Sequence, residues 1–166
     1  MILIAVGANL PDSAGRLALE TCRWAAGQLE RVAPIGAVSR WYCTAPVPAS
    51  DQPDYINGVV RLNGAGDPQK LLDAINAIED AAGRVRGEVN AARVLDLDLL
   101  AVDDQIVSTG TLILPHSRLA QRAFVLVPLC DVAPDWMHPG LGQTAAALLA
   151  GVDRTGVSLA CDRGVA

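Results

Sequence analysis

The sequence has few aromatic residues and almost no lysine. It contains three Trp, two Tyr and one Phe, so any aromatic wall against a flat ligand must come from this small set. Its 13 basic residues include a single lysine, Lys70, and all the others are arginines. An excess of arginine fits a compositional bias, and it also fits planar, bidentate binding of phosphate groups. Composition alone leaves both interpretations open.

The sequence also lacks a surplus of basic charge. It has 18 acidic against 13 basic residues and a net charge of −5 at pH 7, whereas a general nucleic-acid surface needs a basic footprint. Hydrophobic residues make up 51% of the 166 positions and charged residues 19%, which is a globular and not a disordered composition. We therefore expect no nucleic-acid partner and a single domain over residues 1–166, with no assigned motif after about residue 151.

Long apolar runs and paired cysteines are absent from the sequence too. No run reaches the length of a membrane span, and the first eight residues lack the basic start of a signal peptide. The four cysteines are far apart and form no CxxC pair, which is typical of a reducing compartment. We expect a cytoplasmic monomer with no membrane partner.

Hydrophobic periodicity and turn residues predict a strand, a helix, two strands, a helix and a strand. Asp12 suits the N-cap of the first helix, with Leu17 on the inner face, and Asp67 followed by Pro68 suits the start of the second. The predicted strands cover residues 2–8, 37–43, 55–63 and 94–102, and the predicted helices cover 12–31 and 67–83. This order is the ferredoxin-like βαββαβ arrangement, an α+β fold with an antiparallel sheet.

The C-terminal part of the chain adds further elements to this predicted core. The apolar run over residues 124–129 predicts another strand, and residues 144–150 predict a short helix. A loop rich in proline separates the second and third predicted strands, over residues 44–54.

The most informative segment of the sequence is the predicted strand that contains Asp96 and Asp98. Residues two apart in a strand share a face, so these carboxylates lie side by side while Leu95, Leu97 and Leu99 enter the core. Adjacent carboxylates repel one another unless a cation lies between them. Hard oxygen ligands that leave coordination positions open suit Mg²⁺ bound together with a polyphosphate. The alternative interpretation is an exposed polar face of an edge strand.

Arginines surround this carboxylate pair in the sequence. Arg84, Arg86 and Arg93 precede it, and His116 and Arg122 follow it. The sequence has no GxxxxGK[ST] loop and no GxGxxG loop, so no glycine-rich cradle holds a phosphate. Arginine forks and metal ions would instead meet the phosphate charge, as in nucleotide-dependent phosphoryl or pyrophosphoryl transfer. A solvated surface with local ion pairs is the alternative.

A second group of residues suits a flat heterocycle. Tyr55 and Asn57 share one face of a predicted strand, where a ring can stack and a carboxamide can pair with the edge of a ligand. Thr44 and Val47 lie on the preceding loop, and Phe124 would supply the opposite stacking wall. Plain packing of Tyr55 on the sheet is the alternative interpretation.

Five motifs occur in order along the chain. They are Val-Gly-Ala-Asn-Leu at 6–10, Gln-Pro-Asp-Tyr-Ile-Asn at 52–57, Gly-Arg-Val-Arg at 83–86, Arg-Val-Leu-Asp-Leu-Asp-Leu-Leu at 93–100, and Leu-Pro-His at 114–116 with Arg-Ala-Phe-Val-Leu-Val-Pro-Leu at 122–129. Together they resemble the 6-hydroxymethyl-7,8-dihydropterin pyrophosphokinase family of folate biosynthesis. The resemblance extends to about residue 151, and its most diagnostic part is Arg-x-x-Asp-x-Asp.

The resemblance implies transfer of a pyrophosphoryl group from ATP to the pterin hydroxymethyl group, with release of AMP. It implies that Asp96 and Asp98 hold two Mg²⁺ ions. The catalytic residues would be Arg84, Arg93, Asp96 and Asp98. The residues on the ATP side would be Glu79, Arg86, His116 and Arg122. The residues around the pterin would be Thr44, Val47, Tyr55, Asn57, Asp96 and Phe124.

The chain departs from the family pattern between Arg86 and Arg93, where the tryptophan that many members carry is absent. The alternative function is a non-catalytic ferredoxin-like module that binds a small ligand. Such a module would require neither a carboxylate pair on one face nor converging arginines, and it would bind its ligand without forming a product.

Overall fold

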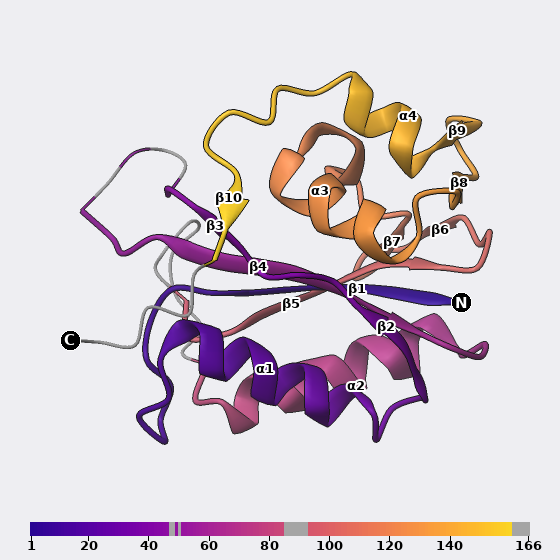
Figure 1. The fold of residues 1–166 in the computed structure, drawn as a ribbon. Helices are drawn as coiled ribbons and strands as arrows, with labels where there is room; N and C mark the ends of the chain where they lie inside the picture. Colours follow the sequence, from indigo (N-terminus) through magenta and orange to yellow (C-terminus); the bar gives the residue numbers. More distant parts are fainter. Residues whose placement is uncertain (47–48, 50, 85–92, 161–166) are drawn as a thin grey trace.

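An antiparallel six-stranded sheet lies between two pairs of helices (Figure 1). The computed structural model describes residues 1–46, 49, 51–84 and 93–160. The strands of the sheet are β1 (Ile2–Ala8), β2 (Ile35–Val38), β3 (Tyr42–Thr44), β4 (Tyr55–Leu62), β5 (Asp96–Val102) and β10 (Ser158–Leu159). Their hydrogen-bonded order is β10-β3-β4-β1-β5, with β2 also paired to β4. Strand β1 is thus an inner strand, flanked by β4 and the edge strand β5.

Helices α1 (Ala18–Leu29) and α2 (Pro68–Ala81) cover one face of the sheet, and α3 (Ala123–Val132) and α4 (Ala145–Ala150) lie over the other (Figure 1). The predicted α+β, ferredoxin-like fold is confirmed. The smaller elements are the β6 (Val107–Ser108) and β7 (Ile113–Leu114) hairpin, the 3₁₀ turn η1 (Leu119–Gln121), and the β8 (Met137–His138) and β9 (Gln143–Thr144) hairpin. No helix within the described residues is long and apolar enough to span a membrane.

The sheet separates two hydrophobic cores, as expected when helices cover both faces. The core under α1 and α2 buries Ile4, Leu97 and Leu99. The core under α3 and α4 buries Leu3 and Leu100, which lie on the opposite face of the same strands. Because side chains alternate between the two faces of β1 and β5, each strand contributes residues to both cores.

The sequence signals at helix α2 act as predicted. The Asp67 side chain accepts a hydrogen bond from the backbone N–H of Lys70 at 3.0 Å, and Pro68 occupies the first turn. Gly83 has φ +91°, the left-handed conformation that ends a helix at low cost in glycine. This end of α2 leads directly into Arg84.

The predicted start of the first helix is wrong. Helix α1 begins at Ala18, six residues after Asp12. The carboxylate of Asp12 instead accepts hydrogen bonds from the backbone N–H groups of Ala14 and Arg16 and from Arg16 Nε at 2.6 Å. Because Asp12 caps a loop turn, the chain is not helical there, and Leu17 is 48% exposed and not on the inner face.

The predicted strand over residues 37–43 is divided into β2 and β3. At Ser39 the hydroxyl oxygen accepts the backbone N–H of Val59 at 2.9 Å, and it donates to the carbonyl of Arg40. The N–H of Val59 therefore donates to the Ser39 side chain, whereas in a regular strand pair it would donate to a backbone carbonyl. The interruption leaves β3 as a separate short strand that pairs with the start of β4.

The predicted strand over residues 124–129 is wrong, because this segment lies in helix α3. The run is continuously apolar, and such a run does not distinguish a buried strand from a buried helix. Val125, Leu126, Leu129 and Val132 are buried at helical spacing against the sheet. The predicted short helix is confirmed as α4, where the Thr144 hydroxyl accepts the N–H of Ala147 at 3.1 Å.

Candidate active site

Strand β5 carries the predicted pair of carboxylates on one face. Leu97 and Leu99 are buried at 4% exposure each on the opposite face, as the alternation predicted. In the register with β1, Asp96 lies opposite Gly7 and Asp98 opposite Ala5. The two aspartates therefore lie beside small residues of β1 and not beside bulky ones.

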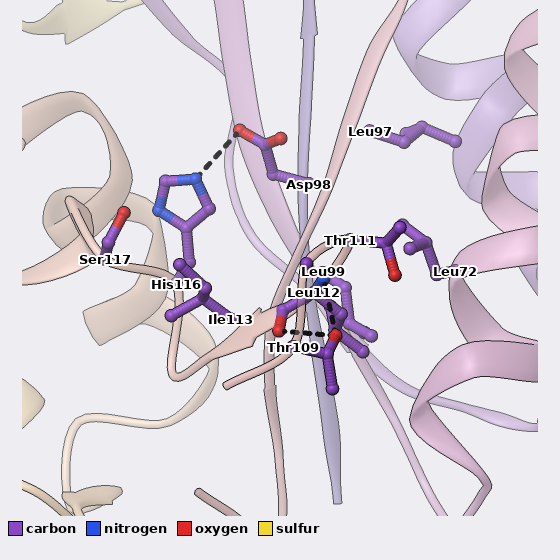
Figure 2. Close-up of a pocket in the computed structure, with 11 residues that line it drawn as sticks. Leu72, Leu97, Asp98, Leu99, Thr109, Thr111, Leu112, Ile113, His116 and Ser117 are labelled. Carbon is purple, nitrogen blue, oxygen red and sulfur yellow. Dashed lines mark hydrogen bonds and ion pairs between the residues drawn. The ribbon is translucent and has the colours of Figure 1, made fainter. Parts of the chain in front are cut away.

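Each carboxylate has a basic side chain nearby. The guanidinium of Arg93 forms an ion pair with Asp96. His116 Nε2 lies 3.9 Å from Asp98 Oδ2, and Figure 2 shows the two side chains directed toward one another. His116 Nδ1 accepts the backbone N–H of Arg118 at 3.2 Å, so the ring proton of a neutral His116 lies on Nε2, facing Asp98.

The surroundings shift the pKa values of Asp96 and His116 in opposite directions. Burial raises the pKa of Asp96, and the neighbouring charge of Asp98 raises it further, while Arg93 opposes both. Burial lowers the pKa of His116 against the attraction of Asp98. Both shifts favour the neutral forms of these groups, and repulsion between the two carboxylates adds to the shift at Asp96.

Glu79 connects helix α2 to the edge of β5. Its side chain is 1% exposed; one oxygen accepts the N–H of Leu97 at 2.8 Å, and the other pairs with the guanidinium of Arg84. Strand β5 is at the edge of the sheet, so its outward N–H needs such a partner. Burial raises the pKa of Glu79, and the bonds from Leu97 and Arg84 oppose that shift. Glu79 therefore holds Arg84 beside the strand that carries the aspartates.

We expect Glu79→Gln to lower kcat about 10- to 100-fold, because Arg84 loses its anionic anchor while Leu97 keeps an acceptor. The fold should survive, with a small change in Tm. Steady-state kinetics and thermal unfolding measure both effects. Asp80→Asn, the neighbouring exposed carboxylate on the same helix, is the control and should behave as wild type. An unchanged kcat in Glu79→Gln would contradict the role of Glu79.

Asn9, at the end of β1, joins two segments of the site. Its Oδ1 accepts the N–H of Arg93 at 2.8 Å, and its Nδ2 donates to the carbonyl of Pro53 at 3.1 Å and to Gln52 Oε1 at 3.3 Å. The side chain is 3% exposed. Asn9 is not among the site residues that were predicted from the sequence. The available signal was its place in the first motif, with Gln52 in the second.

We expect Asn9→Ala to lower the free energy of unfolding by about 1–3 kcal/mol, because the backbone groups of Arg93 and Pro53 lose the buried side chain that bonds them. Urea denaturation measures this change. Asn63→Ala, at an exposed position after β4, is the matched control with little expected effect. Equal stability losses in the two variants would argue against a bridging role for Asn9.

The predicted heterocycle-binding residues gather at the start of β4. Asn57 Nδ2 donates to Thr44 Oγ1 at 2.8 Å, and Tyr55 Oη donates to Gln52 Oε1 at 3.3 Å. Burial raises the pKa of Tyr55, and the charges of Arg93 and Asp96 also act on it. Tyr55 is therefore within electrostatic range of the carboxylate pair. In the register of the sheet, Asn57 lies opposite Gly7, whose other partner is Asp96.

Arg122 and Phe124 meet at the N-terminal end of α3. The guanidinium carbon of Arg122 lies 5.4 Å from the centre of the Phe124 ring. Burial lowers the pKa of Arg122, Arg118 lowers it further, and Asp98 and Asp96 oppose the shift. These charges bring Arg122 into the same electrostatic cluster as the carboxylates. Val47 and Arg86, which were also predicted for the site, lie outside the described residues.

A cavity of about 290 Å³ opens at the free edge of β5, beside Asp98 and His116 (Figure 2). Its walls are of mixed character, with Leu72 from α2 and Leu99 from β5 facing the segment that precedes β7. That segment adds Thr109 and Thr111. Within the described residues no three His, Cys, Asp or Glu side chains form a metal-binding group. One member of the carboxylate pair, Asp98, thus borders a cavity with both leucines and polar side chains in its walls.

Fold and site together define the class of this protein. It is a ferredoxin-like α+β domain that presents paired carboxylates among arginines on one face of its sheet. The model of the family 7,8-dihydro-6-hydroxymethylpterin-pyrophosphokinase (HPPK) matches residues 3–134. The chain belongs to this family.

Relatives of the chain agree with that assignment. It is 40% identical over 141 residues to the 2-amino-4-hydroxy-6-hydroxymethyldihydropteridine pyrophosphokinase of Synechocystis, across 84% of this chain and 72% of that protein. It is 37% identical over 158 residues to the protein of the same name from Pseudomonas aeruginosa, across 94% of both. These findings support a pyrophosphokinase and not the alternative of a non-catalytic module.

Solved structures support the fold independently. A Plasmodium falciparum HPPK-DHPS triple mutant solved with pteroate has a TM-score of 0.67 at 15% sequence identity. The match covers 90% of this chain and 42% of that longer chain. At this identity the likeness concerns the arrangement of helices and strands alone.

Proposed function

We propose that this protein transfers a pyrophosphoryl group from ATP to 6-hydroxymethyl-7,8-dihydropterin, a step of folate synthesis, in a Mg²⁺-dependent reaction. The observation that carries the proposal is the row Asn57, Gly7 and Asp96, which crosses three adjacent strands from the heterocycle-binding group to the carboxylate pair. One face of one sheet thus offers a site for a pterin edge and a site for a polyphosphate.

The carboxylate pair fits Mg²⁺. Asp96 and Asp98 supply hard oxygen ligands on one face. Burial and then the charge of Asp98 raise the pKa of Asp96, and a cation between the two carboxylates would relieve their repulsion. Two carboxylates leave most coordination positions for water and phosphate oxygens, as Mg²⁺ prefers in nucleotide sites. When bound there, the metal would supply positive charge to neutralise the charge that develops on the phosphate oxygens. We propose two ions, both held by Asp96 and Asp98.

The cavity at the edge of β5 suits the nucleoside part of ATP. Its leucines would contact a flat base, and its threonines offer polar contacts. Because Asp98 and His116 line the same cavity, a nucleotide placed there directs its phosphates toward the carboxylates. Arg122 lies in the same electrostatic cluster and would bind phosphate oxygens. Arg86, outside the described residues, remains a predicted ATP ligand.

The pterin would occupy the start of β4. Tyr55 and Phe124 offer aromatic faces, while Asn57 and Thr44 present polar groups to the edge of the heterocycle. The hydroxymethyl group would then point along the row toward Asp96. Val47 remains a predicted contact.

In the proposed reaction, the hydroxymethyl oxygen forms a bond to the β-phosphorus of ATP. The bond from that phosphorus to the oxygen that bridges it to the α-phosphate breaks, so AMP leaves and the hydroxyl proton is released. Arg93, paired with Asp96, and Arg84, anchored by Glu79, are held where they can stabilise charge on the transferred group. Preorganised cations act without moving during the step, which is the source of their effect.

Product analysis tests this proposal. Protein mixed with ATP, Mg²⁺ and the hydroxymethyl dihydropterin should release AMP in equal amount to the pterin diphosphate. AMP formation should cease when the pterin or Mg²⁺ is omitted. Calorimetric binding of both ligands without any product would contradict the proposal and favour a binding module. The cytoplasmic location, the monomeric state and the absence of nucleic-acid or membrane partners stay predictions.

A further inference from the structure

The segment between β1 and α1 contacts the chain beside both Arg84 and Arg93. At one end of this segment, the backbone N–H of Leu10 donates to the carbonyl of Arg93 at 3.2 Å. At its other end, the N–H of Ser13 donates at 3.2 Å to the carbonyl of Ala82, the C-cap residue of α2. Ala82 lies two positions before Arg84. One short segment therefore bonds to the backbone at or next to both arginines.

Asp12 gives this segment its shape at the end that contacts α2. Its carboxylate accepts the N–H groups of Ala14 and Arg16 at 2.9 Å each, and Arg16 Nε at 2.6 Å. The N–H of Asp12 donates to the carbonyl of Arg16 at 3.0 Å. The guanidinium carbon of Arg16 lies 4.3 Å from the centre of the Trp24 ring, which belongs to α1. Because the Asp12 side chain is fully buried, these bonds form a closed turn that is attached to helix α1.

This turn is in direct contact with Gly83. A Cβ built on Gly83 would lie 2.9 Å from Ser13 Cβ and 3.2 Å from Ser13 Oγ, so no side chain fits between the turn and the end of α2. Arg84 follows Gly83 directly in the chain. The path of the backbone from α2 to Arg84 therefore runs against the turn that Asp12 closes.

Arg84 is thus held at two levels. Glu79 pairs with its guanidinium and lies in α2. The turn of Asp12 contacts the backbone that precedes it, through Ser13. A preorganised cation acts on a developing charge only when its backbone and its side chain are both fixed before the reaction. The contact with Asp12 supplies the backbone part of this requirement.

We propose that Asp12 is a positioning residue for the proposed reaction, whose turn holds the backbone before Arg84 so that this arginine keeps its place relative to Arg93. Asp12 would act through Arg84 and not on the substrates. The inference rests on the proposed function and adds to it a residue that places the catalytic arginines. A displacement of about 1 Å can lower a rate about 100-fold, so loss of the turn should slow the chemical step.

The test is a double-mutant cycle with Arg84. Asp12→Ala should lower the single-turnover rate of AMP release about tenfold and change pterin and nucleotide affinities little. In an Arg84→Ala background, Asp12→Ala should cause no further loss, because the residue that it positions is gone. In an Arg93→Ala background, it should again cost about tenfold. Asp153 also closes a loop turn, with the N–H of Thr155 at 2.9 Å, so Asp153→Ala is the matched control and should keep the wild-type rate.

Two further variants cover the case that Asp12→Ala does not fold. Asp12→Asn keeps an oxygen for the two N–H groups but loses the negative charge, so its rate should lie between those of wild type and Asp12→Ala. Gly83→Ala should slow the same step and lose this effect in the Arg84→Ala background, because its Cβ displaces Ser13. Gly156→Ala, at φ +84° with open space around the Cβ, is the control for backbone strain and should keep the rate.

Rapid-quench kinetics, calorimetry for both ligands and thermal unfolding provide the readouts. A wild-type rate in Asp12→Ala would overturn the inference. So would a loss that persists in the Arg84→Ala background, because a general structural defect slows the reaction with or without Arg84. Failure of the proposed function is a different result, since wild-type protein would then release no AMP.

Discussion

Asp96→Asn is expected to lower turnover by about a thousandfold or more, because it removes one of the two carboxylates that would hold Mg²⁺ and the partner of Arg93. The variant should nevertheless fold as well as wild type in the absence of metal. Steady-state AMP release and thermal unfolding measure the two effects. Lost catalysis with retained stability separates a chemical role from a structural one.

The stability part of this prediction follows from the direction of the Asp96 pKa shift. Burial, and then Asp98, raise the pKa of Asp96 above its usual value. A carboxyl with a raised pKa in the folded state weakens that state at pH above the folded pKa, and the penalty fades as the pH falls through it toward the unfolded value. Neutral Asn removes the penalty at pH 7, so Tm without metal should be equal or higher. The difference should shrink in acid.

Asp104→Asn, at an exposed position after the same strand, is the control and should keep full activity. Wild-type protein should also gain Tm when Mg²⁺ and an ATP analogue are added, and Asp96→Asn should gain less, because bound ligands stabilise the folded state by mass action. Full turnover in Asp96→Asn would refute the assignment of the metal ligand. A large loss of Tm without metal would point to a structural role.

Arg93→Ala should lower the rate of the chemical step by about 100- to 1000-fold, the effect of removing one preorganised charge. Pterin and nucleotide affinities should change less, because the predicted role of Arg93 is to stabilise the transferred group. Rapid-quench single-turnover measurements, with separate binding titrations, divide the two effects. Arg93→Lys keeps the charge but not the planar fork, so an intermediate rate is expected.

Arg40→Ala is the matched control for that variant. Arg40 pairs with Asp131 on the surface and lies in the segment between β2 and β3. Its removal should leave the rate of the chemical step unchanged. If Arg93→Ala retained a normal rate, or lost pterin affinity in proportion to its rate, the proposed role of Arg93 would be wrong.

The sheet and the carboxylate pair could be predicted from the sequence because a two-residue period fixes which side chains share a face. Asp96 and Asp98 alternate with Leu97 and Leu99, and only one arrangement buries the leucines. The start of α2 could be predicted equally well, because the capping residue Asp67 and the first-turn residue Pro68 are adjacent in the sequence. These are local signals with a single structural solution.

Other features depend on contacts that no local pattern shows. Helix α3 was predicted as a strand because its continuous apolar run suits both elements, and only packing against the sheet selects the helix. The side chain of Asn9 forms hydrogen bonds with Arg93, which lies more than eighty positions away in the sequence, and with Gln52 and Pro53. The position of Gly7 between Asn57 and Asp96 follows only from the pairing register of the three strands.

We propose that one sheet positions both substrates for a pyrophosphoryl transfer, the pterin on the face of Asp96 and Asp98 and the nucleotide at the free edge of β5. Following the phosphorus atoms of ATP by ³¹P NMR tests it most directly, with the hydroxymethyl dihydropterin and Mg²⁺ present. We expect the β- and γ-phosphorus signals to move together into a pterin diphosphate, while the α-phosphorus becomes AMP. Transfer of the γ-phosphorus alone with formation of ADP, or an unchanged ATP spectrum, would contradict it.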